Sequence, residues 1–230
     1  MQTTARVIRK DGIEIATETF GDPAHPPVLP IMGGMASMLW WPDGFCRRLA
    51  AHARFVIRYD QRDTGLSSKF PPGRPGYGFE DAVDDVFRLL DGYGLSAAHV
   101  VGFSMGGMIG QGAALTRPER VRSLTAISST PIGMDRSHLP KSGEAWLEHM
   151  AVEVDWSDHA ATVAYEVEDA SLIAGTAYEF DEPGTRAFIE KDFDRSGGYL
   201  SATNHIVVLR GGEAWRGAAW DLILMDVQMA

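Results

Sequence analysis

The chain has 230 residues, of which 45% are hydrophobic and 23% are charged, and this composition excludes collagen-like, coiled-coil and intrinsically disordered proteins. Its length suits one domain, or one domain with an inserted subdomain. The formal net charge of −10, from 31 acidic and 21 basic side chains, repels phosphate backbones, so we expect no nucleic acid among its partners.

Strand and helix patterns alternate up to about residue 130. The pair Asp11-Gly12 between two alternating runs predicts a β-hairpin of residues 5–10 and 13–20. The elements predicted after it are a strand at 28–32, a helix at 43–52, a strand at 55–59, a helix at 80–92, a strand at 99–103, a helix at 105–117 and a strand at 123–128. Strands separated by such helices need crossover connections, so we expect the α/β class, with a mostly parallel sheet and helices on both faces.

The character of the sequence changes beyond this region. Charged stretches that favour helix follow one another with no convincing strand between them, and they cover residues 142–153, 158–173 and 182–194. We therefore expect an α/β core at 1–130, a helical cap inserted at 131–212 and an atypical segment at 213–230 that could supply an improvised last strand. No repeat, low-complexity tract or Ser/Gly linker points to a second independent domain.

The segment Gly102-Phe103-Ser104-Met105-Gly106 has the G-x-S-x-G pattern of a nucleophile elbow, and it lies between a predicted strand and a predicted helix. The serine of such an elbow occupies a tight strand-to-helix turn that presents its hydroxyl above the strand ends. Side chains two residues before and after it would collide, so both positions need glycine. Chance matches occur in a chain with 25 glycines, but the flanking strand and helix favour the elbow, with Ser104 as the nucleophile.

A second glycine pair, Gly33-Gly34, ends the third predicted strand and leads into a loop. An oxyanion hole needs one backbone N–H from the residue after the nucleophile and another from a loop of this kind. We therefore expect the amides of Met105 and Gly34 to form the hole. An ordinary Gly-Gly turn is the alternative explanation.

Two further features near these positions have more than one interpretation. Five large apolar side chains could line an acyl pocket or simply belong to the core, and they are Met32, Met35, Met38, Trp40 and Trp41. The charged turn at 58–67 could bind a substrate, but Asp/Arg pairs in such turns more often join loops, which is the role we expect.

Four stretches carry a resemblance to a known family, and they are Met32-Gly33-Gly34, Trp41-Pro42-Asp43-Gly44-Phe45, Arg58-Tyr59-Asp60-Gln61-Arg62-Asp63-Thr64-Gly65 and His99-Val100-Val101-Gly102-Phe103-Ser104-Met105-Gly106-Gly107. Residues 1 to about 215 resemble the α/β-hydrolase superfamily, and specifically its aclacinomycin-methylesterase-like esterases. The resemblance implies the α/β-hydrolase fold, a helical cap over the site, ester hydrolysis through an acyl-enzyme, and no cofactor. By position it also implies that Ser104 is the nucleophile and that the Gly34 and Met105 amides form the oxyanion hole.

The C-terminal part departs from this family, in which the triad acid follows the seventh strand and the histidine follows the eighth. Only about fifteen to twenty residues follow the predicted cap, whereas a strand–helix–strand unit needs roughly 30. We therefore expect the usual last strands and the triad histidine to be missing, since no histidine follows His205. The apolar run at 222–225 could serve as a seventh strand with Asp226 as the acid at its end, and Asp135 is the second choice.

A serine hydroxyl is a weak nucleophile without a base. Of the seven histidines, only His138 and His205 are expected where they could approach Ser104. A surface or cap position is the commoner explanation for each. His205 is the better replacement base, because residues where the cap returns often line the pocket in this superfamily.

The sequence predicts neither a metal nor another cofactor, because no His, Cys, Asp or Glu cluster has the spacing of metal ligands. The single cysteine, Cys46, favours a reducing compartment, and neither a signal core nor 18 consecutive apolar residues occur, so we expect a cytoplasmic protein. The lack of a long apolar run also means that we expect no membrane partner. Missing last strands would leave an exposed sheet edge. Exposed strand edges tend to pair with other chains, so we expect a homodimer or higher oligomer that forms through the C-terminal edge.

These features predict a small serine carboxylesterase that acts on short acyl or aryl esters, with activity reduced by the lack of the usual histidine. The alternative is a catalytically impaired α/β-hydrolase remnant that binds small apolar ligands without turnover. A dehalogenase is disfavoured, because those enzymes need an aspartate where Ser104 stands.

Overall fold

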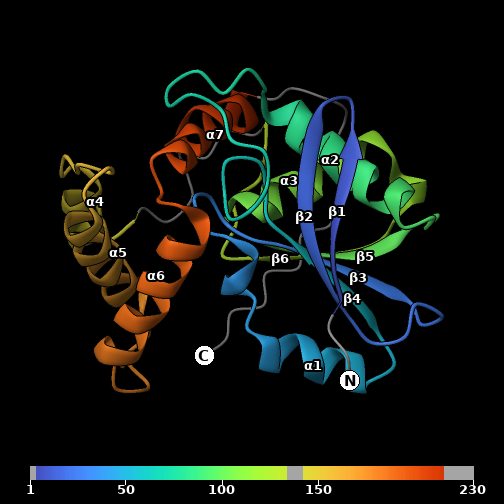
Figure 1. Cartoon of the computed structure of the whole chain (residues 1–230), viewed down its shortest axis with the longest axis horizontal. Helices are drawn as coiled ribbons and strands as arrows, with labels where there is room; N and C mark the ends of the chain where they lie inside the picture. The colour runs from blue at the N-terminus through green and yellow to red at the C-terminus, as the bar shows by residue number, and fades with distance from the viewer. Residues whose placement is uncertain (1–3, 134–141, 215–230) are drawn as a thin grey trace. The chain divides into compact units, whose positions relative to one another are not determined.

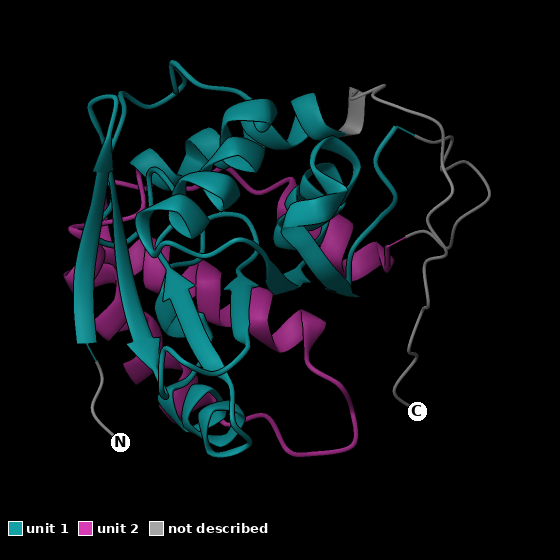
Figure 2. Ribbon diagram, turned by 90° about the vertical axis from the view of Figure 1, so that its right-hand side faces the viewer, with its two compact units in different colours: residues 1–134, 201–230 teal, residues 135–200 magenta. Residues whose placement is uncertain are grey.

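The computed structural model describes residues 4–133 and 142–214 (Figure 1). Contacts divide the chain into two compact units, one of residues 1–134 with 201–230 and one of residues 135–200 (Figure 2). The predicted insertion at 131–212 is therefore longer than the second unit. Its last residues group with the first unit instead, and the three-part domain division remains a prediction.

The first unit contains a six-stranded sheet in the order β1-β2-β4-β3-β5-β6. Its strands are β1 (Thr4–Lys10), β2 (Ile13–Phe20), β3 (Pro27–Ile31), β4 (Phe55–Tyr59), β5 (Ala98–Phe103) and β6 (Val121–Ile127). The pairs β3–β4, β3–β5 and β5–β6 are parallel, whereas β2 pairs antiparallel with both β1 and β4. The predicted α/β class with a mostly parallel sheet is confirmed.

The hairpin between β1 and β2 has the predicted two-residue turn. Lys10 pairs with Ile13, so only Asp11 and Gly12 connect the strands. Their φ angles are 53° and 75°. Two positive φ angles define the type I′ turn, whose twist matches that of the strands and which Asp-Gly favours.

Helices cover both faces of this sheet (Figure 1). The helices of the first unit are α1 (Asp43–Ala51), α2 (Phe79–Gly92), α3 (Met105–Thr116) and α7 (Asn204–Ala214), with the short 3₁₀ helices η1 (Met38–Trp40), η2 (Pro118–Arg120) and η3 (Ser201–Thr203). Val56 and Ile57 of β4 point to opposite faces, as neighbours in a strand must. Ile57 packs in a core with residues of α2, α3 and α7, whereas Val56 packs in a second cluster with residues of α1.

The second unit is helical in its described part, residues 142–200. Its helices are α4 (Glu144–Met150), α5 (His159–Ile173) and α6 (Glu182–Ser196), close to the three predicted stretches. Capping carboxylates begin the two longer helices, because Asp158 accepts the amide of Ala161 and Asp181 accepts the amide of Gly184. No helix in the described parts of either unit is long and apolar enough to cross a membrane.

Candidate active site

Ser104 occupies the turn between β5 and α3. Its φ and ψ angles are 50° and −118°, outside the conformations that side-chain-bearing residues prefer, at a typical cost of about 1–3 kcal/mol. The turn is fixed by two hydrogen bonds, since the Ser104 amide donates to the Ile127 carbonyl at 2.9 Å and the Ser129 hydroxyl donates to the Ser104 carbonyl at 2.8 Å. Ser104 itself is exposed. The strained turn therefore presents a hydroxyl to solvent at the carboxyl end of a parallel strand.

The two glycines of the motif are required by backbone contacts. A Cβ atom on Gly102 would lie 2.2 Å from the Gly106 carbonyl oxygen, and one on Gly106 would lie 2.3 Å from the Ile31 carbonyl oxygen. Real Cβ atoms do not approach this closely. The start of α3 can therefore pack against β5 and β3 only with glycine at both positions, as the sequence pattern predicts.

The loop that follows β3, residues 32–37 and called the β3 loop below, lies beside this turn. A Cβ atom on Gly33 would be 3.4 Å from the Ser104 Cβ, and one on Gly34 would be 3.9 Å from the Met105 sulfur. Among the described residues, the amides of Gly34 and Met105 donate no hydrogen bond. The structure thus brings the β3 loop close to Ser104 and Met105, and the amides of Gly34 and Met105 are not bonded to another described residue.

His205, in the first turn of α7, contacts the β3 loop but is not hydrogen-bonded to Ser104. Its Nδ1 accepts the Met35 amide at 2.9 Å, and its Nε2 lies 2.7 Å from the Arg62 carbonyl oxygen. A carbonyl can only accept, so Nε2 carries the proton and the imidazole is the neutral Nε2–H tautomer. The side chain is 3% exposed. Both ring nitrogens are thus already bonded to backbone groups.

Burial lowers the pKa of His205 below its usual value of 6.5, while its bond to the Arg62 carbonyl and the charge of Asp63 act in the opposite direction. Acid should therefore weaken the fold through this residue. Above pH 6.5 the imidazole is neutral in both the folded and the unfolded chain, so its contribution to the free energy of unfolding does not change with pH. Below that pH the unfolded chain binds a proton that the folded chain resists, so the free energy of unfolding falls by up to about 1.4 kcal/mol per pH unit, until the folded pKa is reached.

Urea unfolding of the wild type and of His205→Asn at pH 7.5 and pH 5.0 would measure this contribution. All other ionisable groups are common to the two proteins. The difference between the two pH dependences therefore isolates His205. We expect the wild type to lose more stability on acidification than the variant, and equal losses would contradict a neutral buried imidazole.

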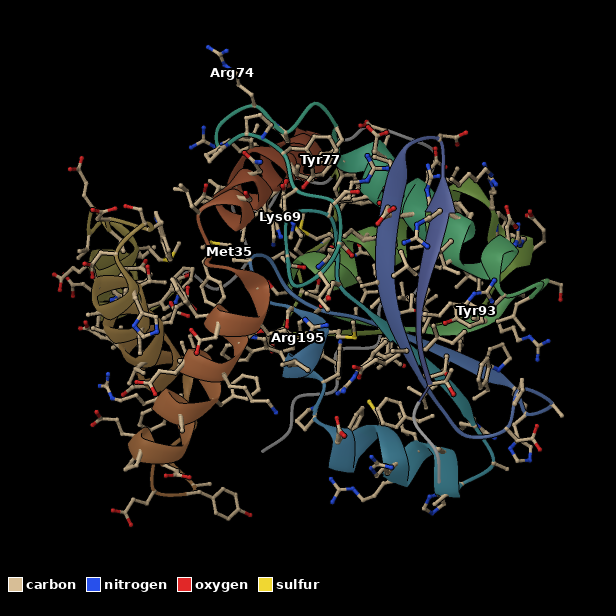
Figure 3. All side chains as sticks on the ribbon, in the orientation of Figure 1. Met35, Lys69, Arg74, Tyr77, Tyr93 and Arg195 are labelled. Carbon is tan, nitrogen blue, oxygen red and sulfur yellow. The ribbon has the colours of Figure 1, made fainter. Side chains whose placement is uncertain are left out.

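Asn204 precedes His205 and joins α7 to the loop between β4 and α2, residues 60–78, called the β4 loop below. Its amide nitrogen donates to Asp63 at 3.0 Å, and its amide oxygen accepts the Gly73 N–H at 2.7 Å. The Asp63 carboxylate also accepts the Tyr77 hydroxyl at 2.8 Å, and Tyr77 lies on the segment leading into α2 (Figure 3). Sequence reasoning missed Asn204, because it places these residues in the cap and its partners lie more than 130 residues away.

The charged turn after β4 joins loops, as expected. The Asp60 carboxylate accepts the amides of Met38 and Leu66 at 2.8 and 2.9 Å. Arg62 forms a bidentate pair with Asp85 of α2, at 2.7 and 2.9 Å, and all three charged side chains are buried. A small cavity adjoins this pair and is lined by Tyr59, Gln61, Arg62, Tyr77, Met105 and His205, among others.

The remaining candidate residues include buried, partly buried and undescribed positions. Met32 and Trp41 are buried in the cluster that packs against α1, and Met38 is 1% exposed, so these three belong to the core, whereas Met35 and Trp40 are only partly buried. Asp135, His138, Asp226 and the run 222–225 lie outside the described residues. In residues 4–133 and 142–214, no group of three or more His, Cys, Asp and Glu side chains could hold a metal ion.

Residues 26–157 match the family described as alpha/beta hydrolase fold. Over 130 residues the chain is 46% identical to rhodomycin D methylesterase DauP of Streptomyces sp. strain C5 and 45% identical to rhodomycin D methylesterase DnrP of Streptomyces peucetius. Each match covers 56% of this chain and 44% of the relative, so the chain spans less than half the length of these relatives.

Solved structures show the same fold at lower identity. A hydrolase from Pseudomonas aeruginosa matches with a TM-score of 0.64 and 22% identity, over 91% of this chain and 73% of that one. A structure from a study of Nitrososphaera gargenis carboxylesterases matches with a TM-score of 0.65 and 19% identity, over 90% and 72% of the two chains. At such identities the likeness concerns the fold alone.

Proposed function

The chain belongs to the α/β-hydrolase fold family, and from this premise we propose that it is a serine carboxylesterase that hydrolyses small carboxylic esters through an acyl-enzyme on Ser104. The observation that carries the proposal is the turn at Ser104, where an exposed serine has a strained backbone conformation and lies close to the loop that carries Gly34. The identity to two methylesterases over 130 residues supports an ester as the substrate.

In the proposed reaction, the Ser104 oxygen attacks the ester carbonyl carbon and a tetrahedral oxyanion forms. The amides of Gly34 and Met105 donate to this oxyanion, and Met105 lies in the first turn of α3, where the helix dipole favours negative charge. Collapse of the intermediate releases the alcohol and leaves the acyl group on Ser104. Water then attacks the acyl carbonyl and releases the acid, which restores the hydroxyl.

A general base must take the Ser104 proton in the first step. His205 as this base and Asp226 as its acid remain predictions from the sequence. Both His205 nitrogens are bonded to backbone groups, so this role would require one of those bonds to break. We therefore propose the nucleophile and the two amides as the reaction's parts, without assigning a base.

Because both His205 nitrogens are bonded to backbone groups, a second candidate function is a protein that binds small apolar ligands without catalysing a reaction. In that case Ser104 would remain an unactivated hydroxyl. The two candidates differ in the reactivity of one side chain, so they can be separated by a covalent probe.

A fluorophosphonate probe reacts with activated serines and tests the proposal directly. We expect one equivalent of label on the wild type, located at Ser104 by peptide mass spectrometry. Ser104→Ala should take up no label, whereas Ser171→Ala, at an exposed serine of α5, should label like the wild type. An unlabelled wild type that also fails to hydrolyse p-nitrophenyl acetate would leave only the binding protein.

We also propose that the chain forms a homodimer or larger oligomer through β6. This strand pairs with β5 on one side and with no other strand in the described residues, and its Thr125 and Ile127 are exposed. Open strand edges tend to pair with other chains. Light scattering at micromolar concentration should give at least twice the mass of one chain, and a single-chain mass throughout would contradict the proposal.

A further inference from the structure

The first two residues of α7 bind two loops that lie far from them in the sequence. His205 bonds to Met35 of the β3 loop and to Arg62 of the β4 loop, and Asn204 bonds to Asp63 and Gly73 of the β4 loop. Both side chains are buried, at 3% and 0% exposure. The start of α7 therefore fixes both loops from one side.

His205 acts on the part of the β3 loop that carries the Gly34 amide. Met35 has a φ angle of 65°, a left-handed conformation that is costly for a residue with a side chain. Its amide belongs to the peptide that follows Gly34, and a Cβ atom on Gly34 would be 3.8 Å from the His205 Cβ. Gly34 is exposed and, as a glycine, can adopt many conformations. The bond from Met35 to His205 anchors the loop directly beside this flexible position.

Asn204 fixes the β4 loop, which carries the Arg62 carbonyl that accepts the His205 N–H. Its partner Asp63 is fully buried, and that carboxylate also accepts the Phe70 amide at 2.6 Å. The β4 loop is thus tied to the helix at the position next to His205. Because the Arg62 carbonyl precedes Asp63, the acceptor that orients the imidazole belongs to the same anchored segment.

We infer that Asn204 and His205 form a clamp that positions the β3 loop, so that His205 is a positioning residue and not the general base. This inference rests on the proposed function, because the loop matters to catalysis only if the Gly34 amide stabilises the oxyanion. The neutral imidazole uses one nitrogen as an acceptor and the other as a donor, which no cationic imidazole can do. Removal of a proton from Ser104 would require it to leave Met35 or Arg62.

Two amide substitutions separate the two bonds. Asparagine places its amide oxygen near the position of Nδ1, and can keep the bond to Met35. Glutamine places its amide nitrogen near the position of Nε2, and can keep the bond to Arg62. We expect His205→Asn to keep kcat for p-nitrophenyl acetate close to that of the wild type. His205→Gln, which releases the β3 loop, should lose about 10- to 100-fold in kcat with little change in KM.

Ile206→Ala is the matched control, because this neighbour on α7 is 43% exposed and contacts neither loop through a hydrogen bond in the described residues. If His205 were the general base, both amide variants would lose turnover equally. The fall of kcat/KM at low pH that protonation of the base causes (the acidic limb of the pH profile) would also disappear in both variants. Equal loss in the two variants would overturn the clamp. An Asn variant that is active and keeps that limb supports it.

Histidine ring nitrogen NMR tests the clamp independently of activity. The wild type should show His205 as the Nε2–H tautomer with Nδ1 accepting a hydrogen bond, and it should remain so below pH 6.5. The opposite tautomer would overturn the inference. If the wild type takes up no phosphonate but shows the expected tautomer, the proposed function fails and the clamp remains as a structural feature.

Discussion

Replacement of Ser104 by alanine is expected to abolish ester hydrolysis while leaving the fold intact. Removal of a serine nucleophile typically lowers kcat by about 10³-fold or more, and the remaining rate comes from binding and oxyanion stabilisation. The Gly34 and Met105 amides are backbone groups and stay in the variant. We therefore expect kcat for p-nitrophenyl acetate to fall by at least about 10³-fold, with KM nearly unchanged.

The same position allows activity and stability to be separated. The Ser104 hydroxyl makes no hydrogen bond to a described residue, so Ser104→Ala should change the free energy of unfolding by less than about 0.5 kcal/mol. Ser104→Gly should be more stable than the wild type by about 1 kcal/mol, because glycine adopts a φ of 50° without strain. An alanine variant that unfolds, or that keeps its rate, would contradict the assignment of Ser104.

The strand and helix pattern was predictable from the sequence, because it depends on local chemistry. Asp11-Gly12 specifies its turn within two residues, and the glycines around Ser104 specify theirs within five. The position of α7 is different. No separate helix is predicted at 204–214, whereas in the structure this helix contacts α2 and α3, and Val208 is buried in their core. Local periodicity shows an apolar face and cannot tell which partner covers it, so the sequence alone places residues 201–212 in the cap.

The candidate site divides in the same way. Ser104, Gly34 and Met105 could be proposed from the sequence, since each lies in a short motif whose backbone geometry the residues dictate. The role of His205 could not be. Its partners lie 170 and 143 residues away, and both are backbone groups. Backbone donors and acceptors occur at every position and leave no trace in the residue types.

Gly106→Ala is expected to destabilise the protein severely, because the added methyl group would overlap backbone. It would lie 2.3 Å from the Ile31 carbonyl oxygen and 2.6 Å from that of Met32, and neither can move without separating β3 from α3. Side chains can rotate away from such a contact, but these carbonyls are backbone groups at the end of β3 and the start of the β3 loop. We expect a loss of roughly 3–5 kcal/mol in the free energy of unfolding, or failure to fold.

Two other glycines in helices provide a graded control for this substitution. Gly110→Ala would meet the Leu124 Cδ1 at 2.6 Å, and that flexible methyl can shift, so a loss of about 1–3 kcal/mol is expected. Gly44→Ala in α1 meets nothing within 4 Å and should stabilise the helix by roughly 0.5–1 kcal/mol. Urea unfolding should therefore rank the variants Gly44→Ala, wild type, Gly110→Ala and Gly106→Ala in falling stability. If Gly106→Ala were as stable as Gly44→Ala, α3 could not approach the end of β3 this closely, and the turn that presents Ser104 would need another support.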